Sequence, residues 1–279
     1  MVYENCETVT RCRDLTVIGR PVIRVKQEEV GETDRIKIGE LWTRAMDYLW
    51  RTQGTIIRAI LEATKIYPHP NLIRFFDMYR VPGGDEYYMY YYCIESIGTI
   101  EDWLKFNSFF TMPINSKIQL LGGLCSAVSH LHKYKLVHRD IKPANIWVVP
   151  DDQIGVKLML GDYKTVEIIG QNFGVEKIGT EGFVPIEIYR NGTIANPRSD
   201  IFSLAATIAF LLSDGRFGYP IRFGYLQELE FINKFELSGM CNEIVINVLK
   251  KAMSENIDER YATVDEFWFE LRQALESLE

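Results

Sequence analysis

Apolar residues follow two different spacings along the chain, and the change between them divides it into a strand-rich part and a helical part. In the first part, β-branched residues cluster around a turn signal at Ile18–Pro21, which is a pattern typical of strands. A second turn signal, Pro82–Asp85, separates two apolar runs and indicates a hairpin. The elements expected here are strands within residues 8–31, a helical stretch over 40–66 that Gly54 interrupts, and strands over 71–79 and 87–93.

From Ile100 onward, apolar residues recur at steps of three and four, which is the spacing of amphipathic helices. The clearest example runs from Ile118 to Leu131, where apolar positions form one face of a long helix that ends near Lys133. Short strands are expected at 146–149 and 156–160, and further helices at 199–212, 243–253 and 263–278. Strands followed by a larger helical part predict an α+β fold.

Composition and charge narrow the classes of function. The 279 residues carry a net charge of −7, which argues against nucleic-acid binding. The five cysteines are scattered without a paired spacing, so they predict no zinc site and fit a reducing compartment. The longest apolar run, Ile201–Leu212, is shorter than the roughly 20 residues of a bilayer span, and the polar N-terminus is unlike a signal peptide. We expect an intracellular protein, cytoplasmic or nuclear, without a membrane segment.

The strongest chemical signal is the run His138–Asn145, which lies between the long helix and the first of the short strands. Phosphoryl transfer needs a carboxylate to orient the attacking hydroxyl, a cation near the transferred group and oxygen ligands for a metal. Asp140 supplies the carboxylate, Lys142 the cation and Asn145 an amide oxygen. Because all three belong to one short loop, the backbone can aim them at one point.

This run, His-Arg-Asp-Ile-Lys-Pro-Ala-Asn, resembles the catalytic loop of eukaryotic-type protein kinases, with Lys142 in the form of the Ser/Thr class. Leu160–Lys164 is similar to the family's metal-binding segment, so the resemblance implies that Asp162 and Asn145 bind Mg²⁺. It also implies ATP as the phosphate donor and a protein as substrate or regulatory partner. The implied fold has two lobes, a small strand-rich lobe over residues 1–93 and a larger helical lobe over 94–279.

Further matches concern the surroundings of the catalytic loop. Ser199–Leu204 resembles the start of the family's central buried helix, which implies that Asp200 braces the loop. Gly179–Glu187 resembles the substrate-side loop, which implies that its Thr180 lies near the catalytic residues and that its final Glu pairs with Arg260.

On the nucleotide side, Tyr90–Cys93 resembles the hinge behind adenine, which makes Tyr91 and Cys93 candidate nucleotide contacts and Tyr90 a bulky gatekeeper. Val9 takes the place of the family's valine after the phosphate-binding loop. The loop itself departs from the pattern, because its glycine positions fall on Val2, Glu4 and Glu7. Glutamates there bring negative charge toward the phosphates and prevent the close backbone approach that glycine allows.

The lysine that grips the phosphates has two candidates. Spacing from Val9 reaches Arg24, whereas the Val-Ala-Ile-Lys-like string Ile23–Lys26 ends on Lys26. The residues two apart lie on the same face of a strand, so either side chain fits the position. The expected partner Glu on the regulatory helix is displaced, and Glu62 is the nearest replacement.

Two functions remain open from the sequence. Asp140, Lys142, Asn145 and Asp162 together favour an active Ser/Thr kinase, because loss of function would be expected to alter at least one of them. The missing glycines and the displaced Glu favour a pseudokinase that acts as an interaction module with weak or no ATP binding. In the activation segment, Thr165 is the one evident phosphorylation candidate, and Arg139 is placed to receive a phosphate on that segment.

Overall fold

The computed structural model describes residues 10–17, 20–24, 37–42, 54–80, 87–92, 96–171, 182–185, 187–188, 196–216 and 242–278. The chain forms two compact units, which are described separately below. The first unit contains residues 1–68 and 73–95, and the second contains residues 69–72 and 96–279. The boundary expected from the sequence lay between residues 93 and 94. None of the helices within the described ranges is long and apolar enough to cross a membrane.

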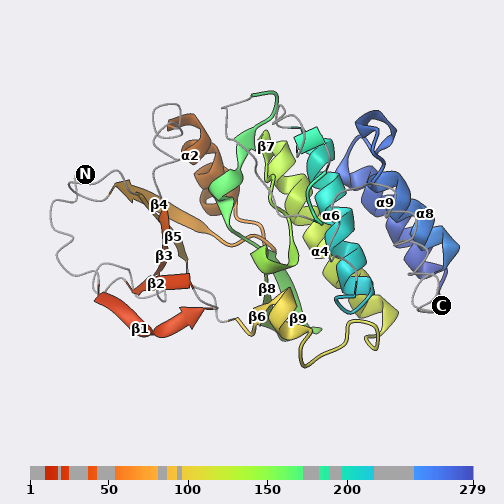
Figure 1. The fold of residues 1–279 in the computed structure, drawn as a ribbon, viewed down its shortest axis with the longest axis horizontal. Helices are drawn as coiled ribbons and strands as arrows, with labels where there is room; N and C mark the ends of the chain where they lie inside the picture. The colour runs from red at the N-terminus through yellow and green to blue at the C-terminus, as the bar shows by residue number, and fades with distance from the viewer. Residues whose placement is uncertain are drawn as a thin grey trace. The chain divides into compact units, whose positions relative to one another are not determined.

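The described strands of the first unit form one antiparallel sheet in the order β1-β2-β3-β5-β4 (Figure 1). Helix α2 (Gly54–Leu61) continues into the π-helical turn η3 (Glu62–Ile66), and both pack against β4. Within η3, the Thr64 hydroxyl donates to the carbonyl of Ile60 and accepts from the N–H of Phe75, which joins helix to sheet. The strands are β1 (Thr10–Val17), β2 (Arg20–Arg24), β3 (Lys37–Trp42), β4 (Phe75–Arg80) and β5 (Tyr87–Tyr92).

The strands expected within residues 8–31 and at 71–79 and 87–93 are confirmed, but the helical stretch over 40–66 is partly wrong. Residues 40–42 belong to strand β3, and the described helix begins only at Gly54. In β3, every residue from Lys37 to Trp42 has a partner in the aromatic strand β5. A continuous ladder of this kind outweighs helical spacing that rests on few apolar residues.

In the second unit, helix α4 (Ile114–Lys133) packs against α6 and α9, and the side chains of Leu121, Leu124, Val128 and Leu131 are completely buried along one face. This is the apolar face that the sequence predicted. Among its described residues, the unit also contains two small sheets, β6-β8-β9 and β10-β7. The remaining elements are α3 (Ile100–Trp103), α6 (Pro197–Leu212), α8 (Glu243–Ala252), α9 (Val264–Glu276), β6 (Gly98–Thr99), β7 (Leu136–Val137), β8 (Ile146–Asp151), β9 (Gly155–Leu160) and β10 (Glu167–Ile168).

Residues 69–72 join the second unit although the chain on both sides of them belongs to the first. The Asn71 side chain donates to the carbonyl of Leu158 at 2.8 Å, and the Asn71 carbonyl accepts from the N–H of Leu160 at 2.8 Å. Asn71 also lies against α4 at Gly123, where an added Cβ would come within 2.7 Å of its side-chain nitrogen. A glycine inside a helix weakens it, so its presence here is explained by this close approach.

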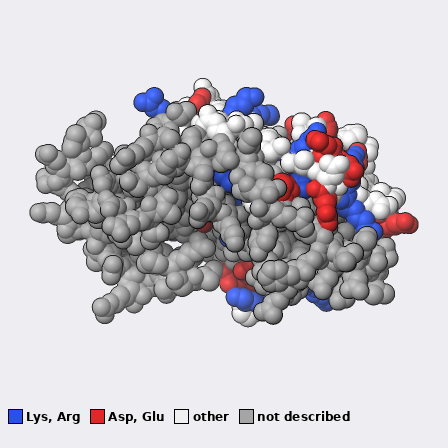
Figure 2. All heavy atoms as spheres, turned by 45° about the horizontal axis from the view of Figure 1, so that its top comes forward, with Lys and Arg blue, Asp and Glu red and all other residues white. Residues whose placement is uncertain are grey.

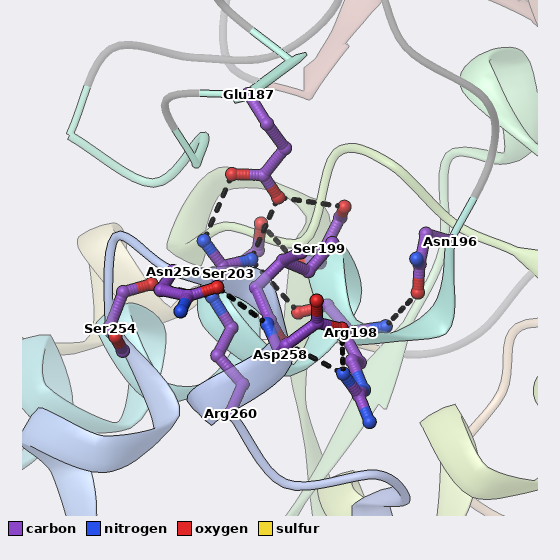
Figure 3. Close-up of polar contacts among 10 residues, drawn as sticks. Glu187, Asn196, Arg198, Ser199, Ser203, Ser254, Asn256, Asp258 and Arg260 are labelled. Atoms are coloured by element: carbon purple, nitrogen blue, oxygen red, sulfur yellow. Dashed lines mark hydrogen bonds and ion pairs between the residues drawn. The ribbon is translucent and has the colours of Figure 1, made fainter.

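The expected pair of Glu187 and Arg260 is confirmed, and it anchors a polar network at one end of α6 (Figure 3). The guanidinium of Arg260 donates to both carboxylate oxygens of Glu187, at 2.7 and 2.9 Å. The same carboxylate accepts from the Ser199 hydroxyl at 3.0 Å, and Arg260 Nε donates to the carbonyl of Ser254 at 2.7 Å. The network therefore joins α6 to the segment before α9.

Replacing Arg260 with Ala should lower the free energy of unfolding by about 3 kcal/mol, because it leaves the Glu187 carboxylate without its cation in a largely buried place. Urea unfolding followed by circular dichroism measures the change. As a control, Arg272→Ala breaks an exposed pair with Glu276 on α9 and should cost less than about 0.5 kcal/mol. Equal losses for the two variants would contradict the role of the network.

Candidate active site

The loop His138–Asn145 is held by one buried carboxylate from α6. Asp200, which is fully buried, accepts from the backbone N–H of His138 at 2.7 Å and of Arg139 at 2.8 Å. It also accepts from Nε2 of His132 at 2.9 Å. The backbone of Arg139 has a left-handed conformation with φ of 68°, which a non-glycine residue adopts only when its surroundings hold it there. The expectation that Asp200 braces the loop is thus confirmed.

Asp140, Lys142 and Asn145 lie in direct contact within this loop. The amide nitrogen of Asn145 donates to the Asp140 carbonyl at 2.8 Å and to Asp140 Oδ2 at 2.9 Å. Lys142 Nζ lies 2.8 Å from the same Oδ2 atom. The Asp140 and Lys142 side chains are partly exposed, at 13% and 16%, so a substrate is able to reach them. The structure therefore brings together the three residues that the sequence selected as catalytic.

The other side of Asn145 offers an acceptor. Its amide oxygen Oδ1 is buried and has no hydrogen-bond partner among the described residues. A buried polar atom without a partner is costly in a folded protein unless something else binds it. The carbonyl of Asn145 accepts from the N–H of Gly161, directly before Asp162, at 3.0 Å, which ties the two expected metal ligands together through the backbone.

These residues fit a magnesium ion. A carboxylate from Asp162 and an amide oxygen from Asn145 are the hard oxygen ligands that Mg²⁺ prefers. Asp162 also has a left-handed backbone, with φ of 61°, so its position is held by the surrounding structure. No group of three His, Cys, Asp or Glu side chains within the described ranges forms a metal site of its own. A magnesium ion here would therefore depend on phosphate oxygens as well, as Mg²⁺ usually does in kinases.

His138 connects the catalytic loop to the metal-binding segment, a role that the sequence did not predict. Its Nδ1 accepts from the N–H of Asp140 at 3.4 Å, so Nε2 carries the hydrogen and donates to the Gly161 carbonyl at 3.0 Å. The ring of Tyr163 meets the His138 ring edge-on, with centroids 6.0 Å apart. Tyr163 is buried, and burial raises the pKa of its hydroxyl, which donates to the Leu160 carbonyl at 3.3 Å. A tyrosine can be buried at position 163 because its hydroxyl has a hydrogen-bond acceptor.

Arg139 has a partner that sequence reasoning missed. Its guanidinium forms a buried ion pair with the carboxylate of Glu167 on β10. Burial lowers the pKa of Arg139, and the charges of Glu167 and Asp200 oppose this change. Thr165, the expected phosphorylation candidate, donates its hydroxyl hydrogen to the His138 carbonyl at 2.8 Å. The ion pair between Arg139 and Glu167 depends on the pairing of β10 with β7, which brings together residues about thirty positions apart in the sequence. No local sequence pattern predicts this pairing.

The candidate nucleotide contacts belong to the first unit. Tyr91 lies in β5 between Ile38 of β3 and Phe75 of β4. Arg24 is the last residue of β2. The third described strand, β3, begins with its one lysine, Lys37. Three other residues expected at the site, Val9, Lys26 and Cys93, lie outside the described residues, as does Thr180.

The net charge of −7 argued against a phosphate-backbone binder and left room for a local basic patch. On the face shown in Figure 2, Lys and Arg side chains of the described residues lie intermingled with Asp and Glu.

Comparison with known proteins places this arrangement in a family. Over residues 43–265 the chain matches the family model of the protein kinase domain. It is 24% identical over 221 residues to the serine/threonine-protein kinase PrkC of Bacillus subtilis, which covers 75% of the chain and 32% of PrkC. It is 27% identical over 204 residues to the putative serine/threonine-protein kinase R436 of Acanthamoeba polyphaga mimivirus, with 71% of each chain covered.

The fold agrees with a solved structure as well. The kinase domain of PknI from Mycobacterium tuberculosis, in a double-mutant form, superposes with a TM-score of 0.69 over 96% of the chain and 95% of PknI, at 16% sequence identity. The two-lobed α+β fold expected from the sequence is therefore confirmed. The chain spans about a third of the length of PrkC, so it corresponds to one part of that protein. The chain belongs to the protein kinase domain family.

Proposed function

We propose that this chain is a Ser/Thr protein kinase domain, which transfers the γ-phosphate of ATP to a hydroxyl group of a protein substrate with Mg²⁺ as cofactor. The observation that carries the proposal is the geometry around Asn145. Its amide nitrogen fixes the Asp140 carboxylate at 2.9 Å, while its buried Oδ1 is left without a hydrogen-bond partner among the described residues. A metal ligand is the simplest use of that oxygen. The family generally uses ATP and Mg²⁺.

In this proposal each residue has a separate task. Asp140 orients the acceptor hydroxyl toward the γ-phosphate and accepts its proton as the oxygen attacks. Lys142, which lies 2.8 Å from Asp140 Oδ2, turns toward the transferred group and offsets its negative charge. Asn145 and Asp162 hold the magnesium ion, which when bound neutralises charge on the phosphates. Lys142 in this position favours Ser and Thr hydroxyls as acceptors.

The nucleotide itself would be held from the first unit, by Val9, Tyr91 and Cys93 around adenine and by Lys26 or Arg24 at the phosphates. Arg24 is the last residue of β2, and Lys26 lies two positions beyond it in the sequence. The glycine positions that fall on Val2, Glu4 and Glu7, together with the displaced partner Glu, support a second candidate function, a pseudokinase that binds ATP weakly or not at all and acts as a regulatory module.

A thermal-shift titration separates the two functions. Binding to the folded state alone stabilises it by about 2.7 kcal/mol at a ligand concentration of 100 times Kd. We expect ATP with Mg²⁺ at millimolar concentration to raise the melting temperature, and ATP with EDTA to raise it less. Asp162→Asn should remove most of the magnesium-dependent part, because it weakens a metal ligand. A melting temperature that stays constant up to millimolar ATP would support the pseudokinase.

Transfer of phosphate tests the catalytic residue. Asp140→Asn should lower kcat by a factor of about 100 or more on Ser- and Thr-containing peptides, because the amide cannot accept the proton of the hydroxyl. The shift with ATP and Mg²⁺ should remain, since Asp140 is not assigned to nucleotide binding. Radiolabel transfer measures the rate, with Asp152→Asn, in the exposed turn between β8 and β9, as the matched control. Undiminished transfer by Asp140→Asn would show that another group is the base.

A further inference from the structure

The buried ion pair between Arg139 and Glu167 stands beside the catalytic residues without taking part in the proposed chemistry. The Arg139 side chain is 2% exposed and that of Glu167 is 1% exposed. Burying two charges costs free energy that their attraction often does no more than offset, so such a pair is weak evidence for stability alone. A positional role in the fold is the better-attested use of buried charges.

Arg139 is held at two points. Its N–H donates to Asp200 at 2.8 Å, and its guanidinium pairs with Glu167. Between these points the backbone keeps a φ of 68°, an arrangement that relaxes in a non-glycine residue unless both sides restrain it. The next residue in the chain is Asp140. The direction of its carboxylate therefore depends on the conformation of Arg139.

Glu167 comes from the segment that follows the metal-binding Asp162, and protein contacts tie this segment to the catalytic loop. In the β10–β7 pair, Glu167 lies opposite Val137. The Ile169 N–H donates to the Lys135 carbonyl at 2.8 Å, and the Thr165 hydroxyl donates to the His138 carbonyl at 2.8 Å. Contacts from Thr165 to Ile169 thus run alongside the chain that enters the catalytic loop.

We propose that Glu167 is a positioning residue, which orients Asp140 through Arg139 and makes a phosphate on the activation segment unnecessary for activity. The inference rests on the proposed kinase function and adds its mode of regulation. Arg139 is the residue that would receive such a phosphate, and its NH1 group already pairs with the Glu167 carboxylate, while its Nε is buried without a hydrogen-bond partner among the described residues. A phosphate brought to the same place would meet the negative charge of Glu167, which opposes its binding.

The acceptor residues of the segment agree with this reading. Between Asp162 and Glu187 the sequence contains Tyr163, Thr165 and Thr180 and no serine. Tyr163 is buried at 1% exposure, and a phosphate on Thr165 would break its bond to the His138 carbonyl. Thr180 lies outside the described residues and is monitored in the experiment.

The test uses the isosteric variant Glu167→Gln, which keeps the size of the side chain and removes its charge. We expect kcat for peptide phosphorylation to fall by about 100-fold, the effect of misplacing a catalytic group by about 1 Å, with the KM for ATP changed less than about twofold. The wild-type protein should keep its activity after phosphatase treatment, with mass spectrometry verifying that Thr165 and Thr180 carry no phosphate. Glu276→Gln, which removes one charge from an exposed pair on α9, should leave kcat unchanged.

A double variant separates positioning from stability. Arg139→Met combined with Glu167→Leu removes both charges, and an apolar pair of similar volume usually preserves the stability that a lone buried charge would lose. We expect its melting temperature to return to near the wild-type value while kcat stays low. Recovery of both the melting temperature and kcat in the double variant would show that the ion pair is structural only. Full activity of Glu167→Gln would show the same. Loss of wild-type activity after phosphatase treatment would contradict the proposal that activity needs no phosphate on the activation segment.

Amide hydrogen exchange gives a readout that does not depend on catalysis. Glu167→Gln should speed exchange at the N–H groups of His138, Arg139 and Asp140, while Glu276→Gln should not. If the wild-type protein transfers no phosphate, the proposed function fails, and unchanged exchange in Glu167→Gln would separately refute the positioning role. Faster exchange in a catalytically inactive wild-type protein would leave the positioning role standing in a pseudokinase.

Discussion

Asp200 brings a full negative charge into the middle of the second unit, on a helix whose side chains are almost all buried. A lone carboxylate in such a place would be very unfavourable, and three hydrogen-bond donors from the catalytic loop and α4 make it tolerable. The constraint works in both directions. The Asp200 carboxylate on the helix requires hydrogen-bond donors. The loop supplies them from the successive backbone N–H groups of His138 and Arg139, with Arg139 in a strained left-handed conformation that places the next residue, Asp140. The geometry of the catalytic loop is thereby fixed by the hydrophobic core.

Two further networks of buried charges occur among the described residues of the second unit. Glu187 and Arg260 form an ion pair at one end of α6, and Glu167 on β10 forms an ion pair with Arg139. Each network has its charged members largely buried and hydrogen-bonded, which makes it sensitive to the loss of any single partner. In the sequence, the positions at which the kinase pattern has the glycines of the nucleotide loop carry Val2, Glu4 and Glu7.

How much the sequence could predict depended on the separation of the residues involved. Asp140, Lys142 and Asn145 lie within one loop, so their contacts follow from local order, and the helices of the second unit were predicted correctly from their spacing. The resemblance to kinases supplied Asp200 and the pair of Glu187 with Arg260. Glu167 was missed because its position depends on a strand pair between distant segments. Residues 40–42 were misread because their partner strand lies elsewhere in the chain.

The second unit is not continuous in sequence, because residues 69–72 belong to it and residues 73–95 do not. Because Asn71 supplies an acceptor to Leu160 and a donor to Leu158, the strand that leads to Asp162 is completed by a piece of chain from before residue 96. The polypeptide therefore passes between the two units three times. No single cut separates them cleanly, and a fragment that begins at Ser96 would leave these backbone groups of β9 without partners. Expression of the second unit therefore requires a chain that also contains residues 69–72.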